Sequence, residues 1–239
     1  MKILVDSHSH TVVSGHAYST RMEMIQAAKN RGLEALALTE HAPEMPGACH
    51  EFYFQNYTVV PREVDGLHIL MGVELNIMDE YGTVDLPAGV LKSMDLAIAS
   101  IHGPCYGESR SRELNTQAYL NVMKNPYIHI IGHPDDGRFP IDYEKLVRGA
   151  KETNTLLEMN NSSLRPGGFR VNTEVNAKEI LELCKKEGVY NTTGSDAHID
   201  ADAGEFSCIE KILQETDFPE ELIATTSYEK FSRLIRQKG

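Results

Sequence analysis

The chain has 239 residues, which fits one domain of the size of an α/β barrel and is long enough to bury a full core, so we expect a single domain over 1–239. Its formal net charge of −12, with no basic stripe, argues against a general nucleic-acid-binding protein. No stretch comes near the ~18 apolar residues that a membrane helix needs, and the four cysteines are scattered, so we expect a cytoplasmic globular protein with reduced thiols.

Seven short apolar segments recur along the chain, and each ends in polar residues. They are 2–6, 34–39, 68–74, 96–101, 128–133, 156–161 and 189–196. Apolar runs without alternation are typical of strands that are buried on both faces, as in parallel sheets. We therefore expect seven strands of a largely buried parallel sheet.

Helix-like segments lie between several of these strands. They are 19–32, 115–125, 142–153 and 172–188, whereas 40–67 is less regular and its part 41–56 is expected to be a long loop. Strands that alternate with helices indicate βα units. Seven such strands predict an α/β fold, a distorted seven-stranded (β/α)7 TIM-like barrel, with an open doubly wound sheet as the structural alternative.

Histidines and two carboxylates follow the predicted strands directly. Those at strand ends are His8, His10, His41, Glu74, His102, His133, Asp196 and His198, and His16 lies within loop reach of them. In a barrel the carboxyl ends of the strands converge on one face, where active sites are built. The alternation of His8 and His10 directs both imidazoles to one side, with Ser9 pointing away.

This set of side chains predicts a metal centre. Neutral imidazole is the commonest metal ligand, and a site rich in imidazole with few carboxylates and no thiolate suits zinc, manganese or iron. Nine ligands exceed what one tetrahedral zinc needs, so two or three ions are implied. We expect Glu74, central in the strand order, to bridge two of them. His68, His129 and His50 are expected to be structural, with a position at the rim of the site as the alternative for His50.

The motifs at these positions resemble the PHP (polymerase and histidinol phosphatase) superfamily. They are H-x-H at His8 and His10, "TEH" ending at His41, and "GSDAH" with Asp196 and His198. The likeness runs from residue 2 to about 235 and is greatest to the YcdX-like metal-dependent phosphatases. It implies a distorted seven-stranded barrel that holds three divalent metal ions, usually Zn²⁺, with Mn²⁺ or Fe²⁺ as alternatives.

The resemblance also implies how the ligands are shared. The three groups are His8, His10, Glu74 and Asp196; Glu74, His102 and His133; and His16, His41 and His198. One departure from the family pattern is Glu40, where an aspartate commonly precedes the histidine. We expect Glu40 to orient His41 from behind, because outer carboxylates commonly hold metal-binding histidines.

The activity that the resemblance implies is hydrolysis of phosphomonoesters by a metal-activated hydroxide, with no catalytic side chain beyond the metal-bound water. A small phosphorylated substrate is the expected partner, and neither a membrane nor a nucleic acid is expected. Four alternatives stay open: histidinol phosphatase proper, a DNA-processing phosphoesterase or nuclease, a metal-dependent amidohydrolase, and a metal-binding scaffold without catalysis. Amidohydrolases usually place a modified lysine at the end of strand four, where this chain has His102.

Loops that follow the strands also carry candidate substrate-binding residues. They are Arg110, Arg112, Arg138, Arg165, Arg170 and Asn160. Arginine favours bidentate contact with phosphate, which is why we expect at least one of them to hold the substrate. The general acid is not assigned. Whether the chain forms a homo-oligomer also stays open, because the loop 42–58 suits either a lid or an interface.

Overall fold

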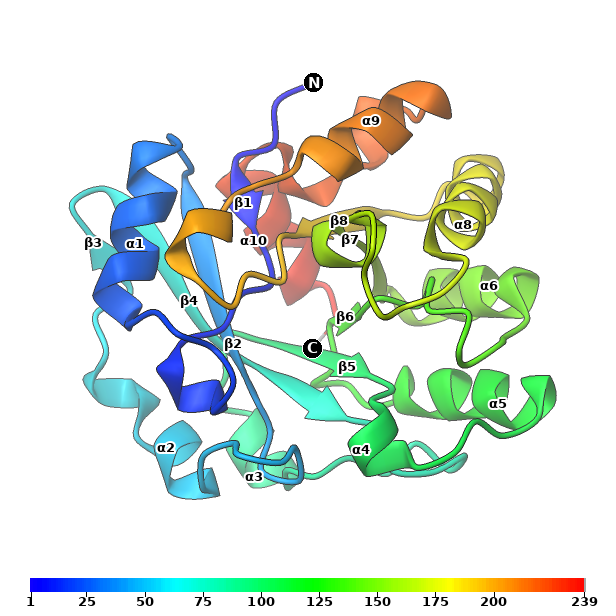
Figure 1. Cartoon of the computed structure of the whole chain (residues 1–239), viewed down its shortest axis with the longest axis horizontal. Coiled ribbons are helices and arrows are strands. Elements are labelled where there is room, and N and C mark those ends of the chain that lie inside the picture. Colours follow the sequence, from blue (N-terminus) through cyan, green and yellow to red (C-terminus); the bar gives the residue numbers. More distant parts are fainter. Residues whose placement is uncertain (239) are drawn as a thin grey trace.

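Seven parallel strands form the centre of the computed structural model, which describes residues 1–238 (Figure 1). Their order in the sheet is β1 (Val5–Asp6), β2 (Ala35–His41), β4 (Leu67–Asn76), β5 (Leu96–Ser100), β6 (Ile130–Ile131), β7 (Leu156–Asn160) and β8 (Asn191–Gly194). The short β3 (Glu63–Val64) pairs antiparallel with β4, outside this path.

The sheet closes on itself where the segment around β8 meets the segment around β1. The amide of Ser7 donates to the carbonyl of Thr193 at 3.2 Å, and the amide of Asp196 donates to the carbonyl of His8 at 2.9 Å. The predicted seven-stranded barrel is therefore confirmed, and the open doubly wound alternative is wrong. The second of these hydrogen bonds brings His8, the first predicted ligand of the chain, beside the predicted ligand Asp196.

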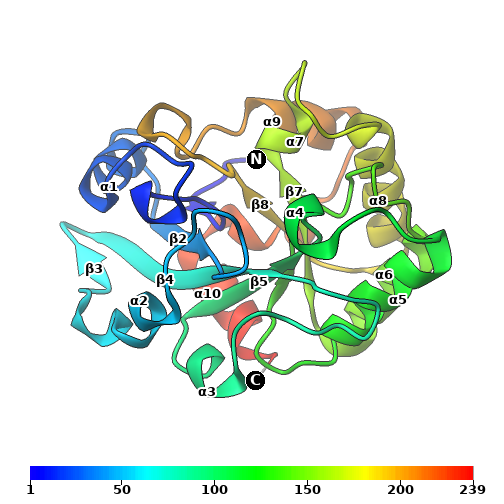
Figure 2. The same ribbon diagram turned by 60° about the horizontal axis from the view of Figure 1, so that its bottom comes forward.

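Ten helices surround this barrel in the described part of the chain (Figure 2). They are α1 (Arg21–Asn30), α2 (Glu51–Gln55), α3 (Ala88–Leu91), α4 (Gly103–Tyr106), α5 (Arg112–Val122), α6 (Tyr143–Thr153), α7 (Asn161–Leu164), α8 (Thr173–Glu187), α9 (Ser207–Glu215) and α10 (Tyr228–Arg236). Helices α1, α5, α6 and α8 correspond to the four predicted ones. Among residues 1–238, none of the helices is both long enough and apolar enough to cross a membrane.

Local sequence signals explain where the predicted helices begin and end. Thr20 caps α1 with a capping box, in which the Glu23 carboxylate accepts from the Thr20 amide at 2.7 Å. Helix α8 ends at Gly188, whose φ of 71° lies in the left-handed region that glycine adopts without strain. In contrast, 41–56 is not the continuous loop that we expected, because α2 lies within it.

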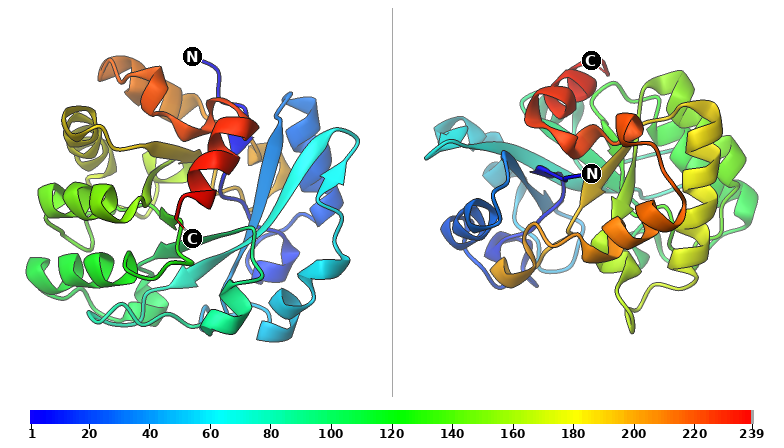
Figure 3. Two further views of the ribbon diagram at one scale, coloured as in Figure 1. Left: turned by 180° about the vertical axis from the view of Figure 1, so that it is seen from behind. Right: turned by 90° about the horizontal axis from the view of Figure 1, so that it is seen from above.

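The hydrophobic core has an outer and an inner part. Strand side chains that point outward pack against the surrounding helices, whereas those that point inward form a separate cluster with α10. The inner cluster includes Val5, Ala37, Leu70, Leu96, Ile98, Ile130 and Leu156, which contact Phe231, Leu234 and Ile235 of α10. Seen from behind, α10 (red) lies across the middle of the barrel (Figure 3). This apolar closure leaves the opposite end of the barrel for polar residues.

Phe231 is expected to be a major contributor to stability, because its side chain is fully buried in the inner cluster. Its replacement by alanine should cost about 3–5 kcal/mol in the free energy of unfolding, the range measured for buried phenylalanines. Urea unfolding measures this loss. Phe52, which is 71% exposed, is the control, and its replacement by alanine should leave the unfolding midpoint nearly unchanged. An unchanged midpoint for Phe231→Ala would show that α10 does not close the core.

Candidate metal centre

The carboxyl ends of the strands bring all nine predicted ligands into one cluster. Two of them, His8 and His10, follow β1, and their Nε2 atoms lie 3.1 Å apart. Ser9 between them turns away, because its hydroxyl donates to the carbonyl of Ala37 on β2 at 2.7 Å. The H-x-H spacing thus directs two ring nitrogens to one point, as the sequence predicts.

Glu74, at the carboxyl end of β4, occupies the middle of the cluster. Its Oε2 atom lies 2.8 Å from Nδ1 of His41 and 3.3 and 3.5 Å from Nε2 of His8 and His10, and its Oε1 atom lies 3.0 and 3.2 Å from Nε2 of His133 and His102. The two oxygens of one carboxylate therefore face different sets of imidazoles. This is the position that a carboxylate shared by two ions requires.

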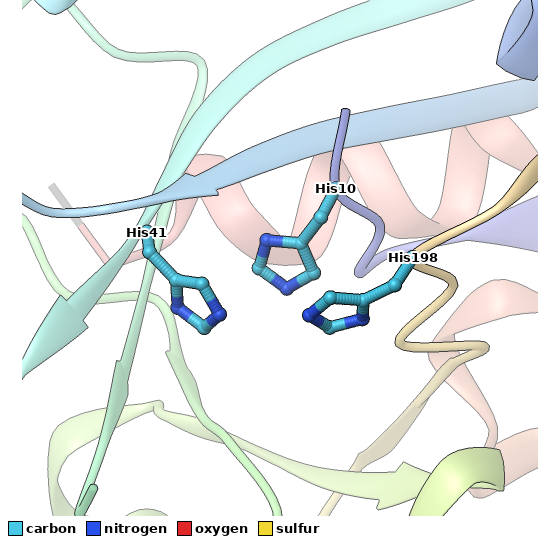
Figure 4. Close-up of side chains that lie close together, drawn as sticks. All are labelled: His10, His41 and His198. Carbon is cyan, nitrogen blue, oxygen red and sulfur yellow. The ribbon is translucent and has the colours of Figure 1, made fainter. Parts of the chain in front are cut away.

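The remaining ligands lie on the other side of His10. Nε2 of His10 is 3.4 Å from Oδ1 of Asp196, and Nδ1 of His198 is 3.6 Å from the same oxygen. The ring of His16 stacks on His41 and on His198, with ring centroids 4.8 Å apart in both pairs. Figure 4 shows the rings of His10, His41 and His198 directed toward one another from three separate segments.

The chemistry of this cluster fits divalent metal ions. Three sets of donor atoms lie within 4.8 Å of one another, namely His10, His41 and His198; His8, His10 and Glu74; and His41, Glu74 and His102. Buried Nδ1 of His41 and Oε2 of Glu74 face each other outside hydrogen-bond geometry, and neither has a hydrogen-bond partner among the described residues. Buried polar atoms without a partner are costly, and coordination by a metal ion would satisfy both.

The protonation states of two ligands, His10 and Glu74, also suit a metal. Burial, together with the neighbouring His41 and His198, holds the pKa of His10 well below its usual value, so this imidazole is neutral near pH 7. Burial alone would raise the pKa of Glu74, but the imidazoles of His102 and His8 hold it well below the usual range. A neutral imidazole and an ionised carboxylate are the forms that bind metal ions. At His8, burial alone would lower the pKa, but the carboxylates of Glu158, Glu74 and Asp196 raise it well above the usual value, so an ion that binds there has to displace a proton.

Polar residues behind the ligands hold several of the rings. Nδ1 of His102 lies 2.7 Å from the side-chain oxygen of Asn76. The hydroxyl of Ser14 donates to the Glu40 carboxylate at 2.6 Å. The oxygen of this hydroxyl also lies 3.1 Å from Nδ1 of His10 and accepts from the backbone amide of His41 at 3.0 Å. Glu40 therefore acts through Ser14 on the ring of His10 and on the backbone of His41, and not on the His41 ring as we expected.

Glu158 on β7 is a residue that the sequence reasoning missed. Its carboxylate is buried beside His8, with Oε1 2.7 Å from Nδ1 of that ring. The only signal in the sequence is a single acidic residue inside the apolar run "LLEMNN". An acid in a buried strand is costly unless it is paired, but the pattern does not name its partner.

A cavity of about 620 Å³ opens onto the cluster. Three of the five predicted arginines line it, namely Arg138, Arg165 and Arg170. Its other walls include Met45, Pro46, Pro104 and Phe169, together with the ligands His16, His41, His102, His133, Asp196 and His198. The cavity therefore combines polar ligands and arginines with apolar side chains.

The other predicted substrate-binding residues lie elsewhere. Within residues 1–238, Arg110 and Arg112 do not line this cavity. Arg110 pairs with Glu80, and Nε of Arg112 donates to the carbonyl of Ile141 at 3.0 Å. Asn160 is buried behind the cluster, where its amide donates to Oδ2 of Asp196 at 3.2 Å. All five arginines follow strands in the sequence, so this criterion could not predict which of them line the cavity.

The fold and this cluster define a class of protein, a TIM-like barrel with imidazole and carboxylate ligands for metal ions at the carboxyl ends of its strands. A family model described as "PHP domain" matches residues 6–234. The chain belongs to the PHP family, as its motifs indicate.

A curated relative matches the whole chain in sequence, and two solved structures match its fold. A "probable phosphatase" of Clostridium novyi is 46% identical over 239 residues, covering 100% of this chain and 97% of that protein. The crystal structure of histidinol phosphate phosphatase from Lactococcus lactis, in complex with zinc, L-histidinol and phosphate, has a TM-score of 0.66 at 22% identity and covers 93% of this chain and 96% of that one. The crystal structure of a putative histidinol phosphatase from Listeria monocytogenes has a TM-score of 0.61 at 19% identity and covers 85% of this chain and 98% of that one.

Proposed function

We propose that this protein is a metal-dependent phosphatase that hydrolyses small phosphomonoesters at a site of three divalent metal ions, with zinc as the first candidate. The observation that carries the proposal is the position of Glu74, whose two oxygens face two different sets of imidazoles. Among these imidazoles, His41 and His133 line a cavity that arginines also line. The names of the relatives, which are probable phosphatases, agree with it.

The ligand groups implied by the family remain our proposal for how the ions are shared. The grouping of His8, His10 and Glu74 by the structure supports the first ion. His41 faces Glu74 and His102 as well as His10 and His198, so it lies between the proposed second and third ions. His16, which is stacked on His41 and His198, completes the third group.

The protein's own residues prepare the site for a phosphate ester. Bound metal ions would supply Lewis acidity and a water that loses its proton near neutral pH. Arg170 is suited to hold a phosphoryl oxygen, because its side chain is only 8% exposed, it lines the cavity, and its buried Nε has no partner among the described residues. Phe169 and Met45, which also line the cavity, offer apolar contacts for an organic leaving group.

Two alternative activities receive less support from the site. Amidohydrolases usually place a modified lysine after the fourth strand of the barrel. In this chain the fourth strand, β5, leads into His102, and no lysine lines the cavity within residues 1–238. The histidinol phosphatase alternative rests on a solved structure whose 22% identity shows the fold alone. We therefore keep the substrate class at small phosphomonoesters.

Metal content and turnover of p-nitrophenyl phosphate test the proposal together. We expect about three metal ions per chain in protein prepared without chelators, loss of turnover after chelation, and its return when Zn²⁺ or Mn²⁺ is added back. Less than one ion per chain would overturn the metal centre. Three ions without turnover of any phosphomonoester would overturn the phosphatase and leave a metal-binding scaffold.

A further inference from the structure

We infer that Glu158 is a positioning residue that fixes the tautomer of His8 and the direction of His133, and so sets the affinity of the site for its metal ions. This inference rests on the proposed function, because it assumes that the cluster holds metal ions. It concerns a residue outside the nine ligands.

The contacts of Glu158 connect two ligands, His8 and His133, that lie far apart in the sequence. Its Oε1 atom lies 2.7 Å from Nδ1 of His8. Its Oε2 atom accepts from the backbone amide of His133 at 2.8 Å and from the side-chain amide of Asn160 at 3.2 Å. The carboxylate is fully buried. These ligands serve opposite sides of Glu74, since His8 faces its Oε2 atom and His133 faces its Oε1 atom.

The neighbouring strand β8 leaves space for this carboxylate. A Cβ atom on Gly194, which ends β8, would lie 2.2 Å from Oε1 of Glu158, a distance that no real contact allows. A Cβ atom on Gly132, just after β6, would lie 2.2 Å from the hydroxyl of Ser100 and 3.5 Å from Oε2 of Glu158. Gly194 therefore leaves space for the carboxylate of Glu158 and for His8, whereas the close neighbours that limit Gly132 are Ser100 and Ile98.

The contact with His8 determines which ring nitrogen can bind a metal. When Nδ1 carries the proton and donates it to Glu158, Nε2 has a free lone pair, and Nε2 is the atom that faces Glu74 and His10. Outer carboxylates fix the tautomer and ring orientation of metal-binding histidines in this way. With the opposite tautomer, a proton would occupy the position of the metal.

The contact with His133 acts through the backbone. His133 has a φ of 30°, which is an uncommon conformation for a residue with a side chain. The hydrogen bond from its amide to Glu158 supports this turn, which places Nε2 of His133 3.0 Å from Oε1 of Glu74. One carboxylate thus holds the ring of one ligand and the backbone of another.

Glutamine at position 158 provides a sharp test, because it has nearly the same shape but a different set of hydrogen-bonding groups. Both oxygens of Glu158 accept, from Nδ1–H of His8 on one side and from N–H groups of His133 and Asn160 on the other. A glutamine amide offers one oxygen and one NH₂ group. In either orientation, its NH₂ group would face a donor, or His8 would have to change to the tautomer that blocks Nε2.

We expect Glu158→Gln to weaken binding of at least one Zn²⁺ ion by about tenfold to a hundredfold, the usual cost of losing an outer hydrogen-bonding partner. Competition with a chelator of known affinity measures this loss. The visible spectrum of the Co²⁺-loaded variant should also differ from that of the wild type, a readout that a purely structural residue would not change. Equal Zn²⁺ affinity and an identical Co²⁺ spectrum would overturn the inference.

Asp95→Asn is the matched control, because Asp95 also accepts from a backbone amide, that of Met71 at 2.7 Å, and pairs with Arg62. It lies at the start of β5, away from the ligands, so its loss should lower the stability of the protein without changing metal affinity. Unfolding of the metal-free proteins compares the two variants directly. A similar loss of Zn²⁺ affinity in both variants would count against a specific role for Glu158.

NMR of the wild-type protein keeps the inference testable if Glu158→Gln does not fold. In ¹⁵N-labelled, Zn²⁺-loaded wild-type protein, we expect His8 to carry its proton on Nδ1, and a proton on Nε2 would overturn the inference. Failure of this inference can be distinguished from failure of the proposed function. Wild-type protein without metal would overturn the metal centre itself, whereas metal-loaded wild type with an unaffected Glu158→Gln variant would overturn only the role of Glu158.

Discussion

Replacement of Glu74 by glutamine is expected to lower kcat for phosphomonoesters by more than about a hundredfold and to remove metal from the chain. Loss of an outer partner already reduces metal affinity or activity by about tenfold to a hundredfold, and Glu74 is in the proposal a direct ligand of two ions. Its carboxylate is ionised near neutral pH, since the surrounding imidazoles hold its pKa well below the usual range despite burial. Glutamine carries no charge and offers a single oxygen.

Elemental analysis after dialysis, together with steady-state kinetics, checks this expectation. Glu44→Gln is the control, because Glu44 is an exposed carboxylate in the loop after β2 and is not among the grouped metal-binding donors of the described chain. It should keep the wild-type metal content and kcat. Full metal content and normal turnover in Glu74→Gln would show that Glu74 does not bridge ions.

Replacement of Arg170 by alanine is expected to raise KM for phosphomonoesters by about tenfold or more. A hydrogen bond to a charged group contributes about 1.5–3 kcal/mol, and 1.4 kcal/mol corresponds to a factor of ten. Arg170 is preferred over the other two cavity arginines, which form close ion pairs with Asp136 and Asp202 and are 37% and 36% exposed. Each of those guanidinium groups already has a carboxylate partner at 2.6–2.7 Å.

Metal content has to be measured alongside KM, because Arg170 also contacts the proposed ligand Asp196 at 3.2 Å. Arg112→Ala is the matched control, since Arg112 also follows a barrel strand, β5, but donates to the carbonyl of Ile141 outside the cavity. It should leave KM unchanged. An unchanged KM for Arg170→Ala with full metal content would exclude Arg170 from substrate binding, and an increase for Arg112→Ala would favour a different substrate path.

The sequence by itself determined the barrel and the position of the metal cluster. Apolar segments such as 34–39 and 96–101 are continuous because both faces of a barrel strand are buried, so the strands could be recognised locally. Residues that follow such strands share one end of the barrel, which is why His41 and Glu74 could be placed together. Strand lengths were less predictable: β6 has only two residues, since the chain turns at His133 to direct the ligand inward.

Only the tertiary structure decided which side chains support the ligands and which line the cavity. Glu158 and His8 are 150 residues apart, and no local pattern connects them. The same holds for Arg170, whose partner Asp196 lies on a different loop, and for α10, whose apolar face closes the barrel from the end of the chain. A strand period specifies the side of the sheet to which a residue points, but a pairing between distant segments depends on how the whole chain closes.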